Sequence, residues 1–256
     1  MSELIQSHLH ERVLTLRLNR ADKKNALTQA MYTDLAEALK GAAENPEVRV
    51  VVLAGAPDAF TAGNDLQDFL KHPPTGEDAP VARFMRALAS FPKPVIAAVN
   101  GIAIGIGVTL MLHSDLVYVG KGARLQMPFT NIGICPEFAS SYLLPRLMGN
   151  ARAAELVMFG EVFSADKALE YGLVNAVLPD TGVEAHAMER ALKLAQQPPN
   201  ALRVTKKLMR RWSEATALEA IKVEADHFIP MLGQGEAREA MTAFMQKRKP
   251  DFSKFS

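Results

Sequence analysis

Apolar and polar residues alternate along residues 12–19, RVLTLRLN, and this places three leucines on one face. A period of two is typical of a half-buried β-strand. Residues 48–55, VRVVVLAG, and 94–100, PVIAAVN, are almost continuously apolar and predict buried strands. The short runs DLVYVG and ARLQM predict two further strands, so strands recur along the first part of the chain.

Helical spacing of apolar residues is found in LTQAMYTDLAEALKGAAENP, which begins behind a cap at Thr28 and stops at Pro46. Strands and helices alternate in this way to about residue 180. Four amphipathic helical patterns then follow, in EAHAMERALKLAQQ, NALRVTKKLMRRW, ALEAIKVEADHFIPML and EAREAMTAFMQKR. We therefore expect an α/β core over residues 1–195 and a helical region over residues 196–256 that packs on the core or on a partner subunit.

Composition limits the classes of protein to which the chain can belong. Its 256 residues are 48% hydrophobic and 22% charged, which is ordinary for a globular protein with one large core. A net charge of +1, with both signs mixed, argues against binding to nucleic acid or to an anionic membrane surface. No apolar run approaches the roughly 18 residues of a membrane helix, and a signal, transit or peroxisomal targeting pattern is absent. We expect a cytoplasmic protein.

Metal and disulfide chemistry also find little support. The single cysteine, Cys135, excludes an internal disulfide framework and a multi-cysteine metal cluster. His8 and His10 are too few ligands for a metal site, so we expect no metal.

The glycine-rich turn NGIAIGIG, residues 100–107, follows a predicted strand and precedes an apolar segment. A dinucleotide fingerprint needs a third glycine, but Leu110 stands there, and a P-loop needs a Gly-Lys-Ser/Thr sequence that is missing. What remains is a strand that leads into a helix N-terminus, where unpaired backbone N–H groups favour negative charge. Such a turn can bind an oxyanion.

A second small-residue turn occurs in AFTAGNDLQDF, residues 59–69, around Gly63. It is a candidate source of a second oxyanion donor. The alternative is that Asp65 only caps the helix that follows and that both glycine turns serve close packing. The local pattern leaves both interpretations open.

The three blocks FTAGNDL, KPVIAAVNGIAIGIGVTL and MPFTNIGICPEFASSYLLPRLMG resemble, in order and spacing, the signatures of the crotonase, or enoyl-CoA hydratase/isomerase, superfamily. The similarity runs from about residue 12 to the tail KRKPDF and is closest to monofunctional peroxisomal-type Δ3-Δ2-enoyl-CoA isomerases. It implies an α/β fold of the ClpP/crotonase-like type, a spiral of β-β-α units that forms two sheets. The resemblance also implies that the helical tail builds homotrimers, often paired into hexamers.

The resemblance further implies an acyl-CoA thioester as substrate, with no separate cofactor. The backbone N–H groups of Asn64 and Ile106 take the place of the oxyanion donors. Coenzyme A is expected against the first turn and nearby basic residues, although these lysines are equally compatible with a solvated surface. The expected substrate-binding residues are Lys23, Lys24, Ala62, Gly63, Asn64, Asp65, Leu66, Gly105 and Phe129, and the tail residues Lys247 and Lys249 are candidates to approach phosphates.

The general base distinguishes the possible reactions. Hydratases of the superfamily carry two glutamates, at positions that Thr109 and Phe129 occupy here, and neither residue can do general acid–base work. Isomerase-type members place one glutamate a few residues further on, where ICPEFASSY has Glu137. We expect apolar neighbours such as Phe138 to raise the pKa of Glu137. The alternative is that Glu137 only stabilises the first turn of a helix.

The leading functional hypothesis is therefore isomerisation of 3-enoyl-CoA to trans-2-enoyl-CoA in fatty-acid degradation, with Glu137 as the catalytic base. Alternatives are hydration or another crotonase-type acyl-CoA reaction, and a non-catalytic acyl-CoA-binding subunit. The sequence leaves the acyl chain length open. The polar, proline-bearing loop KHPPTGEDAP, residues 71–80, is a candidate mobile lid.

Overall fold

A larger sheet forms the frame of the protein in the computed structural model, which describes residues 3–74 and 76–255. Its six strands lie in the order β1-β2-β3-β5-β7-β10. All pairs in it are parallel except β1 with β2. The strands are β1 Ile5–His10, β2 Val13–Leu18, β3 Val50–Ala54, β5 Val95–Val99, β7 Leu116–Gly120 and β10 Ala176–Leu178.

A smaller sheet has four strands in the order β4-β6-β8-β9. They are β4 Ala59–Thr61, β6 Ile102–Ile104, β8 Arg124–Gln126 and β9 Phe163–Ser164. The chain alternates between the sheets, because β3, β5 and β7 in the larger sheet are followed by β4, β6 and β8 in the smaller one, and helices then lead back. This repetition confirms the expected spiral of β-β-α units.

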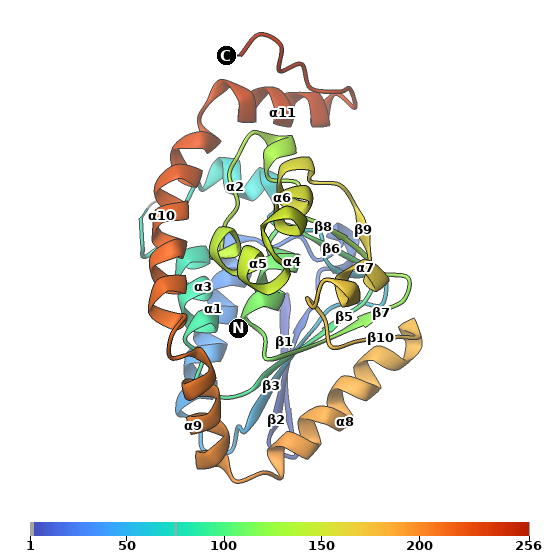
Figure 1. Ribbon diagram of the computed structural model, residues 1–256, viewed down its shortest axis with the longest axis vertical. Helices are drawn as coiled ribbons and strands as arrows, with labels where there is room; N and C mark the ends of the chain where they lie inside the picture. The colour runs from blue at the N-terminus through green and yellow to red at the C-terminus, as the bar shows by residue number, and fades with distance from the viewer. Residues whose placement is uncertain (1–2, 75, 256) are drawn as a thin grey trace.

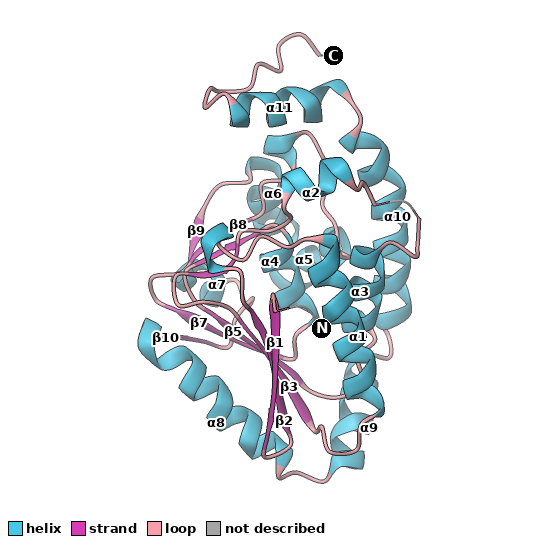
Figure 2. Cartoon of the chain, turned by 180° about the vertical axis from the view of Figure 1, so that it is seen from behind, coloured by secondary structure: helices cyan, strands magenta, loops and turns pink. Residues whose placement is uncertain are grey.

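Helices cover both faces of the larger sheet and one end of the molecule (Figures 1 and 2). On one face, α8 packs its buried alanines against valines of β2 and β3, because small side chains allow a close approach. On the other side, α1 and α3 pack together, and α10 lies beside α3 and α5. The helices are α1 Gln29–Glu44, α2 Leu66–Lys71, α3 Pro80–Ala89, α4 Ile106–Thr109, α5 Ser140–Met148, α6 Asn150–Phe159, α7 Ala165–Glu170, α8 Val183–Ala195, α9 Pro199–Arg210, α10 Glu214–Leu232 and α11 Gly235–Met245.

The elements that the sequence predicted are present in the structure, and the structure adds several short ones, among them β6, β9 and β10. Thr28 caps α1 through its side chain, as predicted, and the four C-terminal helical patterns correspond to α8, α9, α10 and α11. Strand β1 was not predicted, because only Ile5 in it is buried and no alternation marks it. The predicted helix after the second glycine turn is short, since α4 ends at Thr109 and a 3₁₀ turn continues to His113.

The C-terminal helices are part of the folded core region rather than a separate body. Ile221 and Phe228 of α10 belong to the same apolar cluster as the buried residues of β3 and β5. The proposed division at residue 195 stays a prediction. None of the helices in the described ranges has the length and apolar character that crossing a membrane requires.

The loop between α2 and α3 coincides with the polar segment 71–80. Residue 75 lies outside the described residues. The segment contributes Pro74, Gly76, Glu77 and Ala79 to the wall of a cavity. This position fits an element that borders a binding site, and its mobility stays a prediction.

Candidate active site

The two glycine turns lie side by side because β4 and β6 pair in parallel, so that both strands end at the same edge of the smaller sheet. Gly63 follows β4 with φ +87, and a Cβ atom there would lie 2.9 Å from the carbonyl oxygen of Ile104. Gly105 follows β6 with φ +55. Both positions therefore require glycine, the first for space as well as for conformation.

The amides of Asn64 and Ile106 come directly after these glycines. Neither donates a hydrogen bond to another group among the described residues. Ile106 is the first residue of α4, so its N–H has no partner within the helix. The sheet thus brings to one edge the two backbone donors that the resemblance implied.

Asp65 of the first turn has a structural role. Its carboxylate accepts hydrogen bonds from the backbone of Gln67 and Asp68, both at 3.0 Å, and so caps α2. Arg20 holds the other carboxylate oxygen at 2.7 Å. Asp65 therefore caps the helix that follows, and its ion pair with Arg20 ties the turn to the segment after β2.

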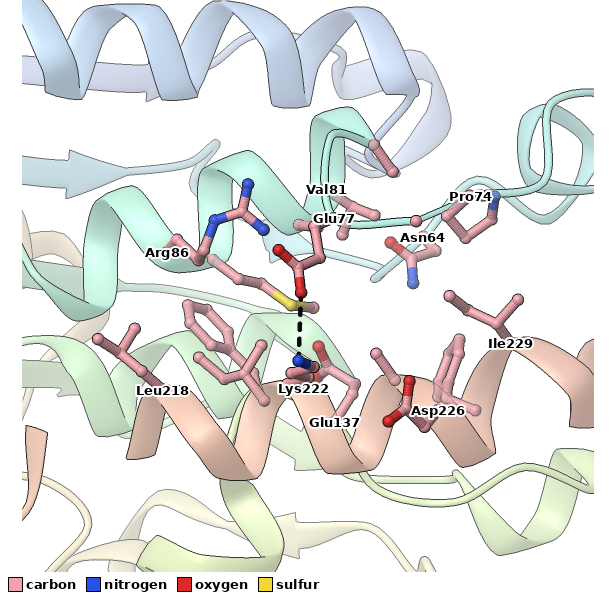
Figure 3. Close-up of a pocket in the computed structure, with 18 of the residues that line it drawn as sticks. Asn64, Pro74, Glu77, Val81, Arg86, Glu137, Leu218, Lys222, Asp226 and Ile229 are labelled. Atoms are coloured by element: carbon pink, nitrogen blue, oxygen red, sulfur yellow. Dashed lines mark ion pairs between the residues drawn. The ribbon is translucent and has the colours of Figure 1, made fainter. Parts of the chain in front are cut away.

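A cavity of about 210 Å³ opens beside Asn64 and Glu137. Figure 3 shows α3 on one side of it and α10 on the other. Its walls are largely apolar, with an ion pair of 3.7 Å between Glu77 and Lys222 across it. The lining residues used below are Asn64, Val81, Met85, Glu137, Phe138, Leu218 and Ile221.

Glu137 is buried at this cavity, with 5% of its surface exposed. Its Oε1 accepts a hydrogen bond of 2.5 Å from the hydroxyl of Thr109, whereas Oε2 has no partner in the described part of the chain. Burial raises the pKa of Glu137 to about 8, against the opposing effect of the Thr109 hydrogen bond and with a further contribution from the charge of Glu224. A carboxyl with a raised pKa and an unpaired oxygen is suited to accept a proton near neutral pH.

The backbone behind Glu137 is strained. Phe138 and Ala139 both have left-handed conformations, with φ values of 59 and 58. This region costs about 1–2 kcal/mol for each residue other than glycine. Helix α5 begins only at Ser140. Glu137 is therefore not in the first turn of a helix, and that structural alternative is wrong.

His113 supports this turn through two contacts with Phe138. Its ring stacks on Phe138 with centroids 4.0 Å apart, and its Nε2–H donates to the carbonyl of Phe138 at 2.8 Å. Burial lowers the pKa of His113 to about 4, so the ring is neutral. His113 is thus a core residue and does not line the cavity.

Tyr32 is a site residue that the sequence did not suggest. Its hydroxyl donates to Oδ1 of Asn64 from α1. The side-chain nitrogen of Asn64, Nδ2, is consequently the end of its carboxamide that faces the cavity (Figure 3). Tyr32 falls on the apolar stripe of α1, between Met31 and Leu35. A tyrosine on a buried stripe needs a hydrogen-bond partner for its hydroxyl, and this requirement could have marked Tyr32 in the sequence.

Other expected site residues are not among those that line this cavity. Phe129 is buried below Gly105, whose added Cβ would lie 3.9 Å from the Phe129 ring. The expected residues that do not line the cavity are Lys23, Lys24, Ala62, Gly63, Asp65, Leu66, Gly105, Ile106 and Phe129. Their part in binding coenzyme A stays a prediction.

The predicted basic residues are exposed. Lys23 and Lys24 lie in and after a 3₁₀ turn, and Lys24 pairs with Asp58. Lys247 and Lys249 follow α11 in the tail. The exposure of these four lysines is compatible both with contacts to the phosphates of coenzyme A and with side chains that are only solvated.

Comparison with known proteins gives the family. Residues 8–254 match the model of the enoyl-CoA hydratase/isomerase family. The chain is 37% identical to 1,2-epoxyphenylacetyl-CoA isomerase of Escherichia coli K12, over 99% of both chains. It is 38% identical to enoyl-CoA delta isomerase 2 of Rattus norvegicus over 83% of its own length, which is 55% of that protein.

A solved structure of Pseudomonas aeruginosa OdaA superposes with a TM-score of 0.93 at 51% identity, covering 95% of this chain and 99% of that one. The protein therefore belongs to the enoyl-CoA hydratase/isomerase family and is an acyl-CoA enzyme with the crotonase fold. Because the family includes hydratases as well as isomerases, the choice of reaction depends on the site.

The raised pKa of Glu137 predicts an effect on stability. The folded state keeps the Glu137 proton up to a pH of about 8, whereas the unfolded chain loses it near 4.5, so stability falls as the pH rises between these values. Glu137→Gln removes this dependence. In urea unfolding we expect the free energy of unfolding of Glu137→Gln, relative to that of the wild type, to increase by up to about 1.4 kcal/mol per pH unit from pH 5 to pH 8.

The matched control is Glu161→Gln, which alters an exposed carboxylate. Its difference from the wild type should stay constant over the same range. An equal difference between Glu137→Gln and the wild type at pH 5 and pH 8 would contradict the raised pKa.

Proposed function

We propose that the protein isomerises 3-enoyl-CoA esters to trans-2-enoyl-CoA esters. The observation that supports this most is the buried carboxyl group of Glu137, which lies on the wall of a largely apolar cavity and has one oxygen without a hydrogen-bond partner among the described residues. The two unpaired amides of Asn64 and Ile106 supply the second requirement of the reaction, a site for an oxyanion.

In the proposed mechanism, ionised Glu137 removes a proton from carbon 2 of the thioester. The electron pair of the broken C–H bond moves into a dienolate, and its negative charge rests on the thioester oxygen. The N–H groups of Asn64 and Ile106 donate to this oxygen, and the loss of one such donor typically costs on the order of 10²–10³ in rate. Protonated Glu137 then gives the same proton to carbon 4, which completes the shift of the double bond.

The residues around Glu137 favour isomerisation over hydration. Addition of water needs a base to activate it and an acid to protonate the carbon. The group beside Glu137 is Thr109, a hydroxyl that already donates to the carboxyl, and Phe129 has no titratable group. One carboxylate suffices for a proton transfer between two carbons of the same substrate.

The walls of the cavity suit an acyl chain. Val81 and Met85 of α3 face Leu218 and Ile221 of α10, and such apolar surfaces exclude water from the base. The similarity to a 1,2-epoxyphenylacetyl-CoA isomerase over the whole chain makes that thioester the second substrate to test.

The first test compares the wild type with Glu137→Gln on a 3-enoyl-CoA, by following the absorbance of the conjugated product. We expect the variant to bind acyl-CoA but to lose on the order of 10²–10⁴-fold in kcat, because the amide cannot accept the proton. Glu161→Gln, on an exposed surface, should keep the wild-type rate. An inactive wild type, or a Glu137→Gln variant within a few-fold of it, would exclude the single-base mechanism.

We also propose that the chain assembles into a trimer or a pair of trimers. Exposed apolar side chains at the end of α6 support association, with Met158 70% and Phe159 63% exposed in the single chain. Native mass spectrometry should give three or six times the chain mass of 27.9 kDa. A particle of one chain at micromolar concentration would contradict the assembly.

A further inference from the structure

Glu224 lies on the buried face of α10, in line with Ile221 and Phe228. Only 7% of its surface is exposed. No lysine or arginine of the described chain forms an ion pair with it. A carboxylate at a position where helical spacing calls for an apolar residue is unfavourable unless it is well hydrogen-bonded, so packing alone does not account for it.

Both oxygens of Glu224 bind the segment that follows Glu137. Oε2 accepts from the backbone N–H of Ala139 at 2.6 Å. Oε1 accepts from the backbone N–H of Ser141 at 2.9 Å and from the Ser141 hydroxyl. All three groups are donors, so the carboxylate form of Glu224 matches them.

These hydrogen bonds lie at the point where the chain is strained. Ala139 is left-handed and precedes α5 without a side-chain cap of its own. Glu224 replaces that cap from another helix, and the positive end of the α5 dipole favours its charge. From the other side, His113 holds the carbonyl of Phe138. The turn that carries Glu137 is thus clamped between α10 and the 3₁₀ segment that contains His113.

We propose that Glu224 is a positioning residue for the catalytic base: its carboxylate holds the Phe138–Ala139 turn in the conformation that directs Glu137 at the cavity. The inference rests on the proposed role of Glu137. It goes beyond that role because it makes α10, which also forms the acyl wall through Leu218 and Ile221, part of the apparatus that sets the base.

Glu224 also acts on Glu137 through its charge. Its negative charge contributes to the raised pKa of Glu137. Burial raises the pKa of Glu224 itself, while the hydrogen bonds from Ser141 and Ala139 oppose that rise. Other polar groups near Glu137 include Thr109, which donates to its carboxyl, and Tyr32, which remains protonated because burial raises its pKa. The Ser140 hydroxyl donates to the Glu137 carbonyl, and burial, with a small contribution from the charge of Glu137, raises the pKa of the Cys135 thiol.

The test is Glu224→Gln. This substitution keeps the size of the side chain but replaces one acceptor oxygen with an NH₂ group, which then faces a donor of Ala139 or Ser141. With 3-enoyl-CoA we expect kcat to fall at least tenfold while KM stays within threefold. The midpoint of the pH–rate profile should move to lower pH, because a negative charge near Glu137 is lost. Glu219→Gln, an exposed glutamate on the same helix, is the matched control and should change neither value.

A purely structural role would leave the midpoint of the folded variant unmoved. The proposal is overturned if Glu224→Gln keeps kcat within twofold at an unchanged midpoint. If that variant does not fold, Glu224→Asp decides: the shorter side chain draws the carboxylate back from Ala139 and Ser141 and moves its charge away from Glu137, so kcat should fall and the midpoint should move to lower pH. Full activity at an unchanged midpoint would overturn the proposal.

A second readout separates this proposal from the isomerase assignment. The infrared carboxyl band of Glu137, identified by its loss in Glu137→Gln, reports the ionisation of the base without turnover. If this band titrates with a lower pH midpoint in Glu224→Gln than in the wild type, the positioning role is supported even if the wild type does not isomerise 3-enoyl-CoA. An unchanged titration midpoint of the band, together with unchanged binding of acyl-CoA, overturns the proposal.

Discussion

The parallel pairing of β4 with β6 is the constraint on which the site depends. Each strand is only three residues long, yet the register between them brings two chain segments some forty residues apart to a common edge. Both strands follow directly from strands of the larger sheet, β3 and β5, which are themselves paired and fully buried. The rigid frame therefore sets where the amides of Asn64 and Ile106 lie, and glycines at 63 and 105 allow the chain to turn there.

Glu137 and the turn behind it are unfavourable for folding by themselves and are held in place by their neighbours. Glu137 is buried with one oxygen unpaired, and the backbone that follows it is left-handed at two residues. Neither feature favours folding, and both persist because the surrounding core determines them: Thr109 and Glu224 supply hydrogen bonds, and His113 stacks beneath the turn. The same burial that destabilises the ionised carboxyl gives it the affinity for a proton that the proposed reaction needs.

Periodicity predicted the elements well, because most of them bury one face. Strands β2, β3, β5 and β7 and the four C-terminal helices are examples. Strands β1 and β10 of the larger sheet were not predicted, because the residues of β1 after Ile5 are exposed and β10 is three residues long with none fully buried. The spiral order and the position of Glu137 came from the family resemblance, since local spacing left Glu137 open to a capping role. Tyr32 and Glu224 were not predicted: each contacts the site across the fold, and Glu224 lies 85 residues from Ala139 in sequence. Such pairs are set by tertiary packing, which a local pattern does not encode.

The central claim is that one buried carboxyl carries a proton from carbon 2 to carbon 4. It is tested most directly with a 3-enoyl-CoA that bears deuterium at carbon 2, converted by the enzyme in ordinary water and analysed by mass spectrometry and NMR. If Glu137 acts alone in a cavity that excludes water, a substantial fraction of the product carries the transferred deuterium at carbon 4 from the first turnover. Complete loss of the label to water, with only solvent protons at carbon 4, would contradict the account.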